Sequence, residues 1–449
     1  MIILHVIHSV NPETGGPIEG IFSSAGVLLD QGCQREIVSL DSPHDPWVKS
    51  CPLTVYPLGI KHPKYPAWRQ KFPWLRYGYT PHLVPWLKEN AHRYDAIIVN
   101  GLWNYVAFGS WRALSKCKTP YFVYPHGMLD PWLKNFAVKA VAKQVLWWFS
   151  EGPLLANARR VLFTTEEERV LARNIFWPYK CQEMVVAYGS LDVTGDPQTQ
   201  EAAFQARLPQ IAGRRFLLFL SRIHPKKGCD LLIEAFANVA AKDPDLDLVM
   251  AGPDSVGWVE NLQAAASKHG IAHRIHWPGM LKGDAKWGAF RSCEAFVLPS
   301  HQENFGIVVA EAMSCGRPVL TTSKVNTWRE VQDCGGGLIS SDDQAGIIEL
   351  LNLFVGLSEH EKKAMGQCAR QGFVEKFDMR AMAPQVIQAF QAAEIPKDST
   401  PYGWLKALLG RAPWTKVIME NSGVSSRKME QLEAVPSELI NQDAPVLRL

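Results

Sequence analysis

The chain has 449 residues, 47% of them hydrophobic and 20% charged, which excludes a mostly disordered, collagenous or coiled-coil protein. Its 47 basic and 44 acidic residues leave a net charge of +3, so the composition gives no support for a nucleic-acid partner. The nine scattered cysteines include no Cys-x-x-Cys pair, which indicates reduced thiols and argues against a disulfide framework or a structural zinc site.

Short apolar runs alternate with helix-length segments through the first part of the chain. The opening run lacks a basic segment and a small-residue cleavage site, so we interpret it as a strand and not as a signal peptide. The runs are rich in Val and Ile, as in strands buried on both faces, and their alternation predicts a parallel sheet covered by helices. Strands are predicted at 2–7, 36–40, 96–99, 121–124, 161–164 and 184–187, and helices at 20–29, 80–90, 132–149 and 166–173.

A second series of the same kind follows a polar, turn-rich stretch, 189–200, which predicts a linker. The predicted fold class is therefore α/β, with two Rossmann-like domains, 1–195 and 196–395, facing each other across a cleft. We allow for the last helix packing back on the first domain, and we expect a polar tail at 396–449. Strands are predicted at 216–221, 246–251, 274–277, 295–299 and 318–322, and helices at 230–241, 259–269, 282–291, 306–315, 344–353, 359–373 and 379–393.

One window of the first domain is strongly basic. Residues 61–143 carry 13 Lys and Arg against three acidic residues, a net charge of +10, and include six of the 16 Trp. Basic residues interleaved with Trp and Tyr suit the headgroup region of an anionic membrane. We expect the segment 132–149 to lie partly in that interface, with an ordinary core-facing amphipathic helix as the alternative. No run of 18 apolar residues occurs, so the sequence predicts no membrane-spanning helix.

The strongest local signal is the segment 299–316, PSHQENFGIVVAEAMSCG, where a predicted strand ends, a polar loop follows and a helix begins. Ligands of open α/β sheets bind at such strand ends, and the free N–H groups of a helix start suit a diphosphate. Gly306 permits close approach of the backbone, and Glu303 stands in the loop. Glu311 lies among apolar residues, where a carboxylate is costly unless it is paired or binds hydroxyl groups; a buried structural Glu is the alternative.

Three further motifs follow predicted strands. Arg222 and Lys227, in SRIHPKKG, offer a planar fork and a point charge for phosphate oxygens, and we expect both side chains to be solvent-accessible. Gly16, in GGPIEG, allows a tight strand-to-helix turn against a ligand, with a plain turn as the alternative. His126, in HGMLDPW, can donate a hydrogen bond to a sugar hydroxyl or a phosphate, although a lone His is more often structural.

Several familiar catalytic motifs are absent from the sequence. It contains no phosphate-binding G-x-x-x-x-G-K-[ST] loop, no G-x-S-x-G elbow and no metal-spaced cluster of His and Cys. The sequence therefore predicts neither a P-loop enzyme nor a serine hydrolase of that type, and no metal site.

The motifs that are present resemble the retaining glycosyltransferases of the GT-B fold, in the large family 4 (glycosyl transferases group 1), of the bacterial polysaccharide type. The resemblance covers about residues 1–395, and its most specific part is the E-x7-E spacing of Glu303 and Glu311. The segment 188–192, Tyr-Gly-Ser-Leu-Asp, departs from the Asn-Gly-Val-Asp that is frequent in the family.

The resemblance implies roles for the residues singled out above. Glu311 would hold the ribose hydroxyls of a nucleotide-sugar, while Glu303 and the amides near Phe305 would hold the sugar. His126 would reach the sugar and phosphate from the other domain, and Gly16 would let the first helix approach the phosphate. The implied catalytic residues are Glu303 and His126, and the implied donor-binding residues are Gly16, Arg222, Lys227, Asn304, Phe305, Gly306 and Glu311.

We therefore expect the transfer of a hexose from a UDP- or GDP-sugar to a hydroxyl of a glycan or lipid-linked saccharide in polysaccharide biosynthesis, with retention of the anomeric configuration. Arg222, Lys227 and helix starts would stabilise the leaving diphosphate without a metal or any other cofactor. A nucleotide-sugar epimerase of the same fold and a non-catalytic glycan-binding protein are the alternatives. The expected location is the cytoplasm, with peripheral contact to an anionic surface on the inner face of the plasma membrane.

Overall fold

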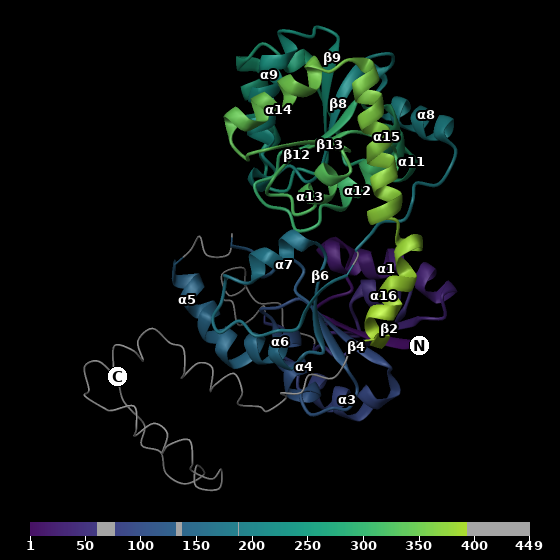
Figure 1. The fold of residues 1–449 in the computed structure, drawn as a ribbon, viewed down its shortest axis with the longest axis vertical. Helices are drawn as coiled ribbons and strands as arrows, with labels where there is room; N and C mark the ends of the chain where they lie inside the picture. The colour runs from purple at the N-terminus through teal and green to yellow at the C-terminus, as the bar shows by residue number, and fades with distance from the viewer. Residues whose placement is uncertain (61–76, 132–136, 187, 393–449) are drawn as a thin grey trace, which may run out of the picture. The chain divides into compact units, whose positions relative to one another are not determined.

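The computed structural model describes residues 1–60, 77–131, 137–186 and 188–392 of the chain (Figure 1). These residues form two parallel β-sheets, one in each half of the chain, with helices packed around each. This is the α/β, Rossmann-like architecture that the alternation of apolar runs and helical segments predicts. The predicted tail, 396–449, and part of the basic window lie outside the described residues.

The first sheet has seven strands in the order β3-β2-β1-β4-β5-β6-β7. All neighbouring strands run parallel, and Val6 of β1 pairs with Val38 of β2 and Val99 of β4. The central strands are buried because helices cover both faces, which accounts for their continuous apolar runs. The strands are β1 (Ile2–Ile7), β2 (Gln34–Ser39), β3 (Thr54–Pro57), β4 (Ala96–Asn100), β5 (Tyr121–Tyr124), β6 (Arg160–Phe163) and β7 (Glu183–Val185).

Three helices of the first half, Gly16–Asp30, Leu83–Asn90 and Glu166–Ala172, lie where the sequence predicts them, whereas the segment 132–157 departs from the prediction. Residues 132–136 lie outside the described residues, and an α-helix covers only Ala137–Leu146. A π-helical turn, Trp147–Glu151, continues it. A π turn does not follow the 3.6-residue period, so the apolar pattern could not place this end. The helices are α1 (Gly16–Asp30), α2 (Pro46–Lys49), α3 (Leu83–Asn90), α4 (Tyr105–Leu114), α5 (Ala137–Leu146), α6 (Gly152–Asn157) and α7 (Glu166–Ala172).

The second sheet has six parallel strands in the order β10-β9-β8-β11-β12-β13. One buried apolar cluster joins this sheet to its helices, and α14 packs against α9 while α8 packs against α11 (Figure 1). The strands are β8 (Arg215–Leu220), β9 (Leu246–Ala251), β10 (Ile275–Gly279), β11 (Ala295–Leu298), β12 (Val319–Thr322) and β13 (Gly337–Ser340). The helices are α8 (Pro197–Arg207), α9 (Cys229–Ala240), α10 (Val259–Lys268), α11 (Gly283–Ser292), α12 (Ile307–Ser314), α13 (Trp328–Asp333), α14 (Gln344–Gly356), α15 (Glu359–Lys376) and α16 (Met379–Ala392).

The sequence patterns miss two edge strands and five helices. The edge strands β3 and β13 contain no fully buried residue, so they lack the continuous apolar run that marks the buried strands of the same length. In β13 the first residue is Gly337, where a Cβ would lie 1.9 Å from the carbonyl oxygen of Val319.

The predicted linker contains the start of α8, which Asp196 caps by accepting a hydrogen bond from the N–H of Thr199 at 2.8 Å. An Asp-Pro pair with no apolar period after it indicates a turn, so this helix was not predicted. The helices α2, α4, α6 and α13 are also absent from the prediction.

The chain passes between its two halves twice, and the two crossings are bonded to each other. The N–H of Ser190 donates to the carbonyl oxygen of Phe377 at 2.9 Å, and the N–H of Met379 donates to that of Ser190 at 3.1 Å. Beyond the second crossing, α16 packs against the first half, where the rings of Phe390 and Phe122 lie 5.0 Å apart within one buried cluster. The last described helix therefore completes the core of the first sheet.

Other chain-wide features bear on the expectations from sequence. All nine cysteines are free thiols. Among the described residues, no helix combines the length and apolar character needed to cross a membrane. The same part of the chain brings together no group of three His, Cys, Asp or Glu side chains that could hold a metal ion.

Candidate active site

Loops at the carboxyl ends of the strands carry the residues singled out in the sequence. The carboxyl ends of parallel strands share one edge of a sheet, so these loops gather in each half. In the first half they follow β1 and β5, and in the second half they follow β8 and β11. Contacts between the two sets of loops are described below, beginning with the second half.

Glu311 is a buried carboxylate with one unused oxygen. It lies on α12, which begins after Gly306 in the left-handed conformation (φ 66°) that glycine adopts without strain. Oε1 of Glu311 accepts a hydrogen bond from Nζ of Lys286 at 2.6 Å, whereas Oε2 is buried without a partner. Burial raises the pKa of Glu311, and the charge of Lys286 opposes that rise. A buried acceptor of this kind is costly when empty and suits a ligand hydroxyl group.

Lys286, from α11, is a site residue that sequence reasoning missed. It lies in the predicted helix 282–291, where a lysine is ordinary, so no local signal marks it. The sequence singles out its partner Glu311 but not the pairing, because the two residues lie 25 positions apart.

Lys227 and Glu303 form an ion pair across two neighbouring loops of the second half. Lys227 is only 8% exposed, so the expectation that its side chain is solvent-accessible is wrong. The reason is this pairing, which draws the ammonium group into contact with the loop after β11. Arg222 is exposed as expected. The structure thus joins two of the predicted site residues directly and leaves the guanidinium beside them facing solvent.

His126 follows β5 in a backbone conformation that is rare for a residue with a side chain, with φ at 50°. Its ring stacks on Tyr124, with centroids 5.2 Å apart. Nε2 of His126 lies 3.1 Å from Oδ1 of Asn100. Burial lowers the pKa of His126 to about 4, so the imidazole is neutral at pH 7.

Asn100 fixes which nitrogen of His126 carries the proton. Its amide nitrogen donates to the carbonyl oxygens of Ile98 at 3.1 Å and Val6 at 3.4 Å, so its oxygen must face the imidazole. Nε2 of His126 is then the donor to Asn100, and Nδ1 is left as the acceptor. Asn100 directly follows a predicted strand, and that position is typical of a site residue. A lone Asn at a strand end is nevertheless an ambiguous signal, so the sequence analysis did not single it out.

Glu168 is a second buried acid that the sequence analysis missed. Its carboxylate accepts hydrogen bonds from the N–H of Gly127 at 2.6 Å and from the N–H and hydroxyl of Thr164, each at 2.7 Å. Asn304 donates to the same hydroxyl at 3.3 Å, which links the loop after β11 to the first half. A Cβ on Gly127 would lie 2.8 Å from Cβ of Asn304, so the loop beside His126 needs glycine there.

Tyr188 connects the remaining site elements. Its hydroxyl donates to the carbonyl oxygen of Gly16 at 3.2 Å, at the start of α1. Its ring lies 5.1 Å from the ring of Phe305 and 6.4 Å from that of His126. Gly20 is required beneath it, because a Cβ there would lie 1.6 Å from the tyrosine hydroxyl oxygen. The segment that departs from the usual family sequence therefore places an aromatic side chain among three predicted site residues.

Comparisons with known proteins agree on one family. The description "Glycosyl transferases group 1" matches residues 201–371, and "Glycosyl transferase 4-like domain" matches residues 15–189. D-inositol 3-phosphate glycosyltransferases from Segniliparus rotundus and Mycolicibacterium gilvum are 28% identical over 254 residues and 32% identical over 239 residues. These matches cover 54% and 52% of this chain and equal shares of the two relatives, so the chain spans about half the length of the curated relatives it matches.

Solved structures share the fold along nearly the whole described chain. Sucrose-phosphate synthase from Thermosynechococcus elongatus has a TM-score of 0.64 at 18% identity, covering 87% of this chain and 99% of the other. Anabaena HepE in complex with UDP has a TM-score of 0.65 at 17% identity, covering 87% of this chain and 100% of the other. The fold is therefore that of the two-domain GT-B glycosyltransferases. The chain belongs to the group 1, GT4-type family of these enzymes, which confirms the resemblance drawn from its motifs.

Proposed function

We propose that this protein transfers a hexose from a UDP- or GDP-sugar to a hydroxyl of a glycan or lipid-linked saccharide, with retention of the anomeric configuration. The observation that carries the proposal is the buried, unpartnered Oε2 of Glu311, an acceptor suited to a ribose hydroxyl. It stands on the helix that follows the loop of Glu303, Asn304 and Phe305. The structural relatives add support, since one of them, Anabaena HepE, was solved in complex with UDP-glucose.

The charge that develops on the leaving diphosphate would be met by Arg222 and Lys227. In the empty site Lys227 is paired with Glu303, so a bound diphosphate would compete with that carboxylate for the ammonium group. Glu303 would then be released toward the hydroxyl groups of the sugar. Neutral His126 would accept a hydrogen bond from a sugar hydroxyl at Nδ1 without adding charge, and the leaving phosphate itself would take the proton of the acceptor.

No metal is required in this scheme, because cationic side chains and helix starts supply the positive charge. We expect activity to persist in excess EDTA. Loss of activity in EDTA with rescue by Mg²⁺ or Mn²⁺ would contradict the scheme.

The decisive experiment incubates the full chain with UDP- and GDP-hexoses, with and without candidate acceptors. Acceptor-dependent release of the nucleotide, with NMR showing the donor anomer retained in the product, is the expected result. Epimerised nucleotide-sugar without any acceptor would instead support the epimerase alternative. The acceptor panel should include a lipid-linked saccharide and D-inositol 3-phosphate, because the curated relatives are named for the latter.

The proposed lipid-linked acceptor rests on a separate surface feature. Val141 on α5, Val145 on α5 and Phe149 in the π turn stand four residues apart and are 67%, 45% and 60% exposed. A row of exposed apolar side chains at helical spacing suits the interface of a membrane. It lies in the segment that the sequence predicts to be interfacial, next to the net positive charge of the window 61–143.

Co-sedimentation with vesicles tests this attachment. Anionic phosphatidylglycerol vesicles should bind the protein at low salt and release part of it at high salt, since surface charge attraction is screened. The double change Val141→Ser and Val145→Ser should reduce the bound fraction. Leu353→Ser, at a 55% exposed position on α14, is the matched control and should leave it unchanged. Failure of the parent protein to bind anionic vesicles at low salt would favour a soluble acceptor.

A further inference from the structure

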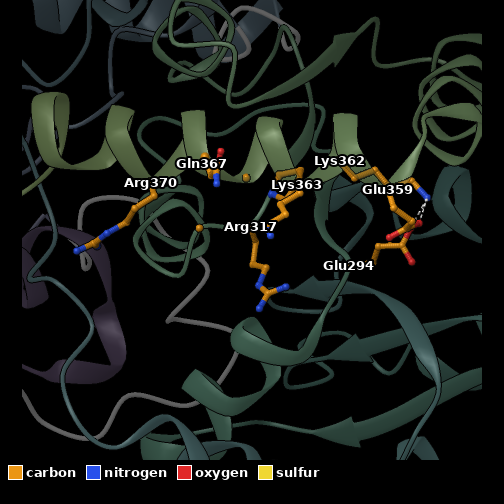
Figure 2. A pocket seen from close by; sticks show the side chains of 10 residues that line it. Glu294, Arg317, Glu359, Lys362, Lys363, Gln367 and Arg370 are labelled. Atoms are coloured by element: carbon orange, nitrogen blue, oxygen red, sulfur yellow. Dashed lines mark hydrogen bonds and ion pairs between the residues drawn. The ribbon is translucent and has the colours of Figure 1, made fainter.

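A cavity of about 340 Å³ lies on the second half, away from the candidate active site (Figure 2). Its lining residues include Glu294 and Pro318, which immediately precede β11 and β12. The active-site loop that carries Glu303 follows β11 at its other end, so the cavity lies at the opposite edge of the same sheet. One wall is α15, and the other is the turn 315–318 that joins α12 to β12.

The charges of the cavity are only partly compensated. Nζ of Lys362 lies 2.7 Å from Glu294 and 3.3 Å from Glu359, so both lining acids face this one lysine. Arg317 and Lys363 have no carboxylate within 4.0 Å among the residues that the structure describes. Figure 2 shows these two side chains in the middle of the cavity, with the Lys362 group at one end. Two cations without acidic partners therefore face one hollow.

Arg317 is held rigidly and keeps one donor unused. Its two terminal nitrogens donate to the carbonyl oxygens of Cys293 and Arg291. Its Nε is buried and has no hydrogen-bond partner. A buried N–H without an acceptor is unusual in a folded protein and costs free energy unless a ligand or water supplies the acceptor.

Two glycines keep the wall of the cavity free of side chains. Gly316 has φ at 65°, a conformation suited to glycine. A Cβ on Gly366 would lie 2.5 Å from the carbonyl oxygen of Gly316, so α15 touches the turn through backbone alone. Lys363 and Gln367, four residues apart and therefore on the same face of α15, flank this contact with exposed side chains.

We propose that this cavity binds a small phosphate-bearing anion. Three hydrogen-bond donors line the cavity: the Lys363 ammonium, the amide nitrogen of Gln367 and the Nε–H of Arg317. A phosphate offers several acceptor oxygens at once. A dianion would also compensate the two cations that lack acidic partners. The volume exceeds that of a bare ion and falls in the range of small-molecule sites, which favours a phosphate monoester over free phosphate.

Calorimetric titration of the full chain with ribose 5-phosphate, inorganic phosphate and unphosphorylated ribose tests the site. We expect ribose 5-phosphate to bind and ribose not to bind. Lys363→Glu should weaken the binding at least tenfold, and since this side chain is exposed and has no carboxylate partner, the fold should be unaffected. Binding of inorganic phosphate as tight as that of the monoester would keep the site and identify free phosphate as its ligand.

Two control variants separate this site from other anion sites. Lys268→Glu makes the same charge change at an exposed position on α10, and Arg222→Ala removes an active-site cation. Both should bind ribose 5-phosphate within twofold of the parent. Binding that disappears in Arg222→Ala but survives in Lys363→Glu would place the phosphate in the active site and overturn the proposal. Equal losses in Lys363→Glu and Lys268→Glu, or no binding by the parent at millimolar concentration, would also overturn it.

Discussion

Replacing Glu311 by Gln tests the proposed nucleotide site most directly. The change keeps the shape of the side chain and removes its charge. Of the two carboxylate oxygens, Oε1 already accepts from Lys286 at 2.6 Å, and only the buried Oε2 lacks a partner. The variant should therefore lose the charge assistance of essentially one new hydrogen bond to a ribose hydroxyl.

The size of the loss follows from that count. A hydrogen bond to a charged group contributes about 1.5–3 kcal/mol and one between neutral groups about 0.5–1.5 kcal/mol, so the change should cost about 1–1.5 kcal/mol. Since about 1.4 kcal/mol corresponds to a factor of ten in Kd, nucleotide affinity should fall about tenfold. Stability should change by less than about 1 kcal/mol, because a costly buried charge is removed while Lys286, with its side chain 23% exposed, remains accessible to water.

Two measurements on the same variants check this reasoning. Calorimetry with UDP and GDP gives the affinity, and urea unfolding without nucleotide gives the stability. Glu234→Gln, at an exposed position on α9, is the control and should alter neither. Nucleotide affinity within twofold of the parent, or a loss of more than about 3 kcal/mol in stability, would mean that Glu311 is a structural buried acid.

Three further changes test other parts of the structure. Asn100→Asp should raise the pKa of His126 from its value of about 4, because a carboxylate at 3.1 Å stabilises the imidazolium. NMR titration of ¹⁵N-labelled histidine measures this pKa, and an unchanged value would show that the two side chains are not in contact. Burial raises the pKa of Glu151, which is fully buried, to about 7. The contribution of this carboxyl group to the free energy of unfolding is therefore fully present below pH 4.5 and is lost as the pH rises through 7. The difference in the free energy of unfolding between Glu151→Gln and the parent, measured in urea, should therefore favour the variant by about 3 kcal/mol more at pH 8 than at pH 4.5. A difference that does not change with pH would refute the raised pKa. Phe390→Ala should lower the free energy of unfolding by about 3–5 kcal/mol, since the ring packs on buried Phe122, and a loss below 1 kcal/mol would show that α16 does not stabilise the first half.

Local patterns were enough to place most of the sheet architecture and the main loops of the site. The pattern of the segment 299–316 predicted a strand end, a loop and a helix, and β11 and α12 confirm that arrangement. Buried strands carry continuous apolar runs, and the loops after them are polar, so this contrast is legible in sequence. The predicted end of the helix 132–149 was wrong because a π turn interrupts the 3.6-residue period of apolar side chains on which the prediction relies.

The partners of the site residues could not be predicted in the same way. Glu168 stands in the run Glu166–Glu168, and nothing local distinguishes the one buried acid from its neighbours. Lys286 and Asn100 acquire their positions only through contacts with distant segments. The pairing of Lys227 with Glu303, 76 positions apart, likewise arises from two loops that only the folded sheet brings together. Side-chain pairing over such separations is set by tertiary packing, which a single sequence does not display.

The packing of α16 has a consequence for synthesis on the ribosome. The first sheet is complete in sequence by Val185, but Val386 and Phe390, which cover part of its apolar surface, are made about 200 residues later. At roughly 5–20 residues per second, the growing chain exposes this uncovered face for about ten seconds or more. A truncated first half would keep the same face exposed permanently. A fragment meant to represent that half should therefore be fused, through a linker, to the helix Met379–Ala392.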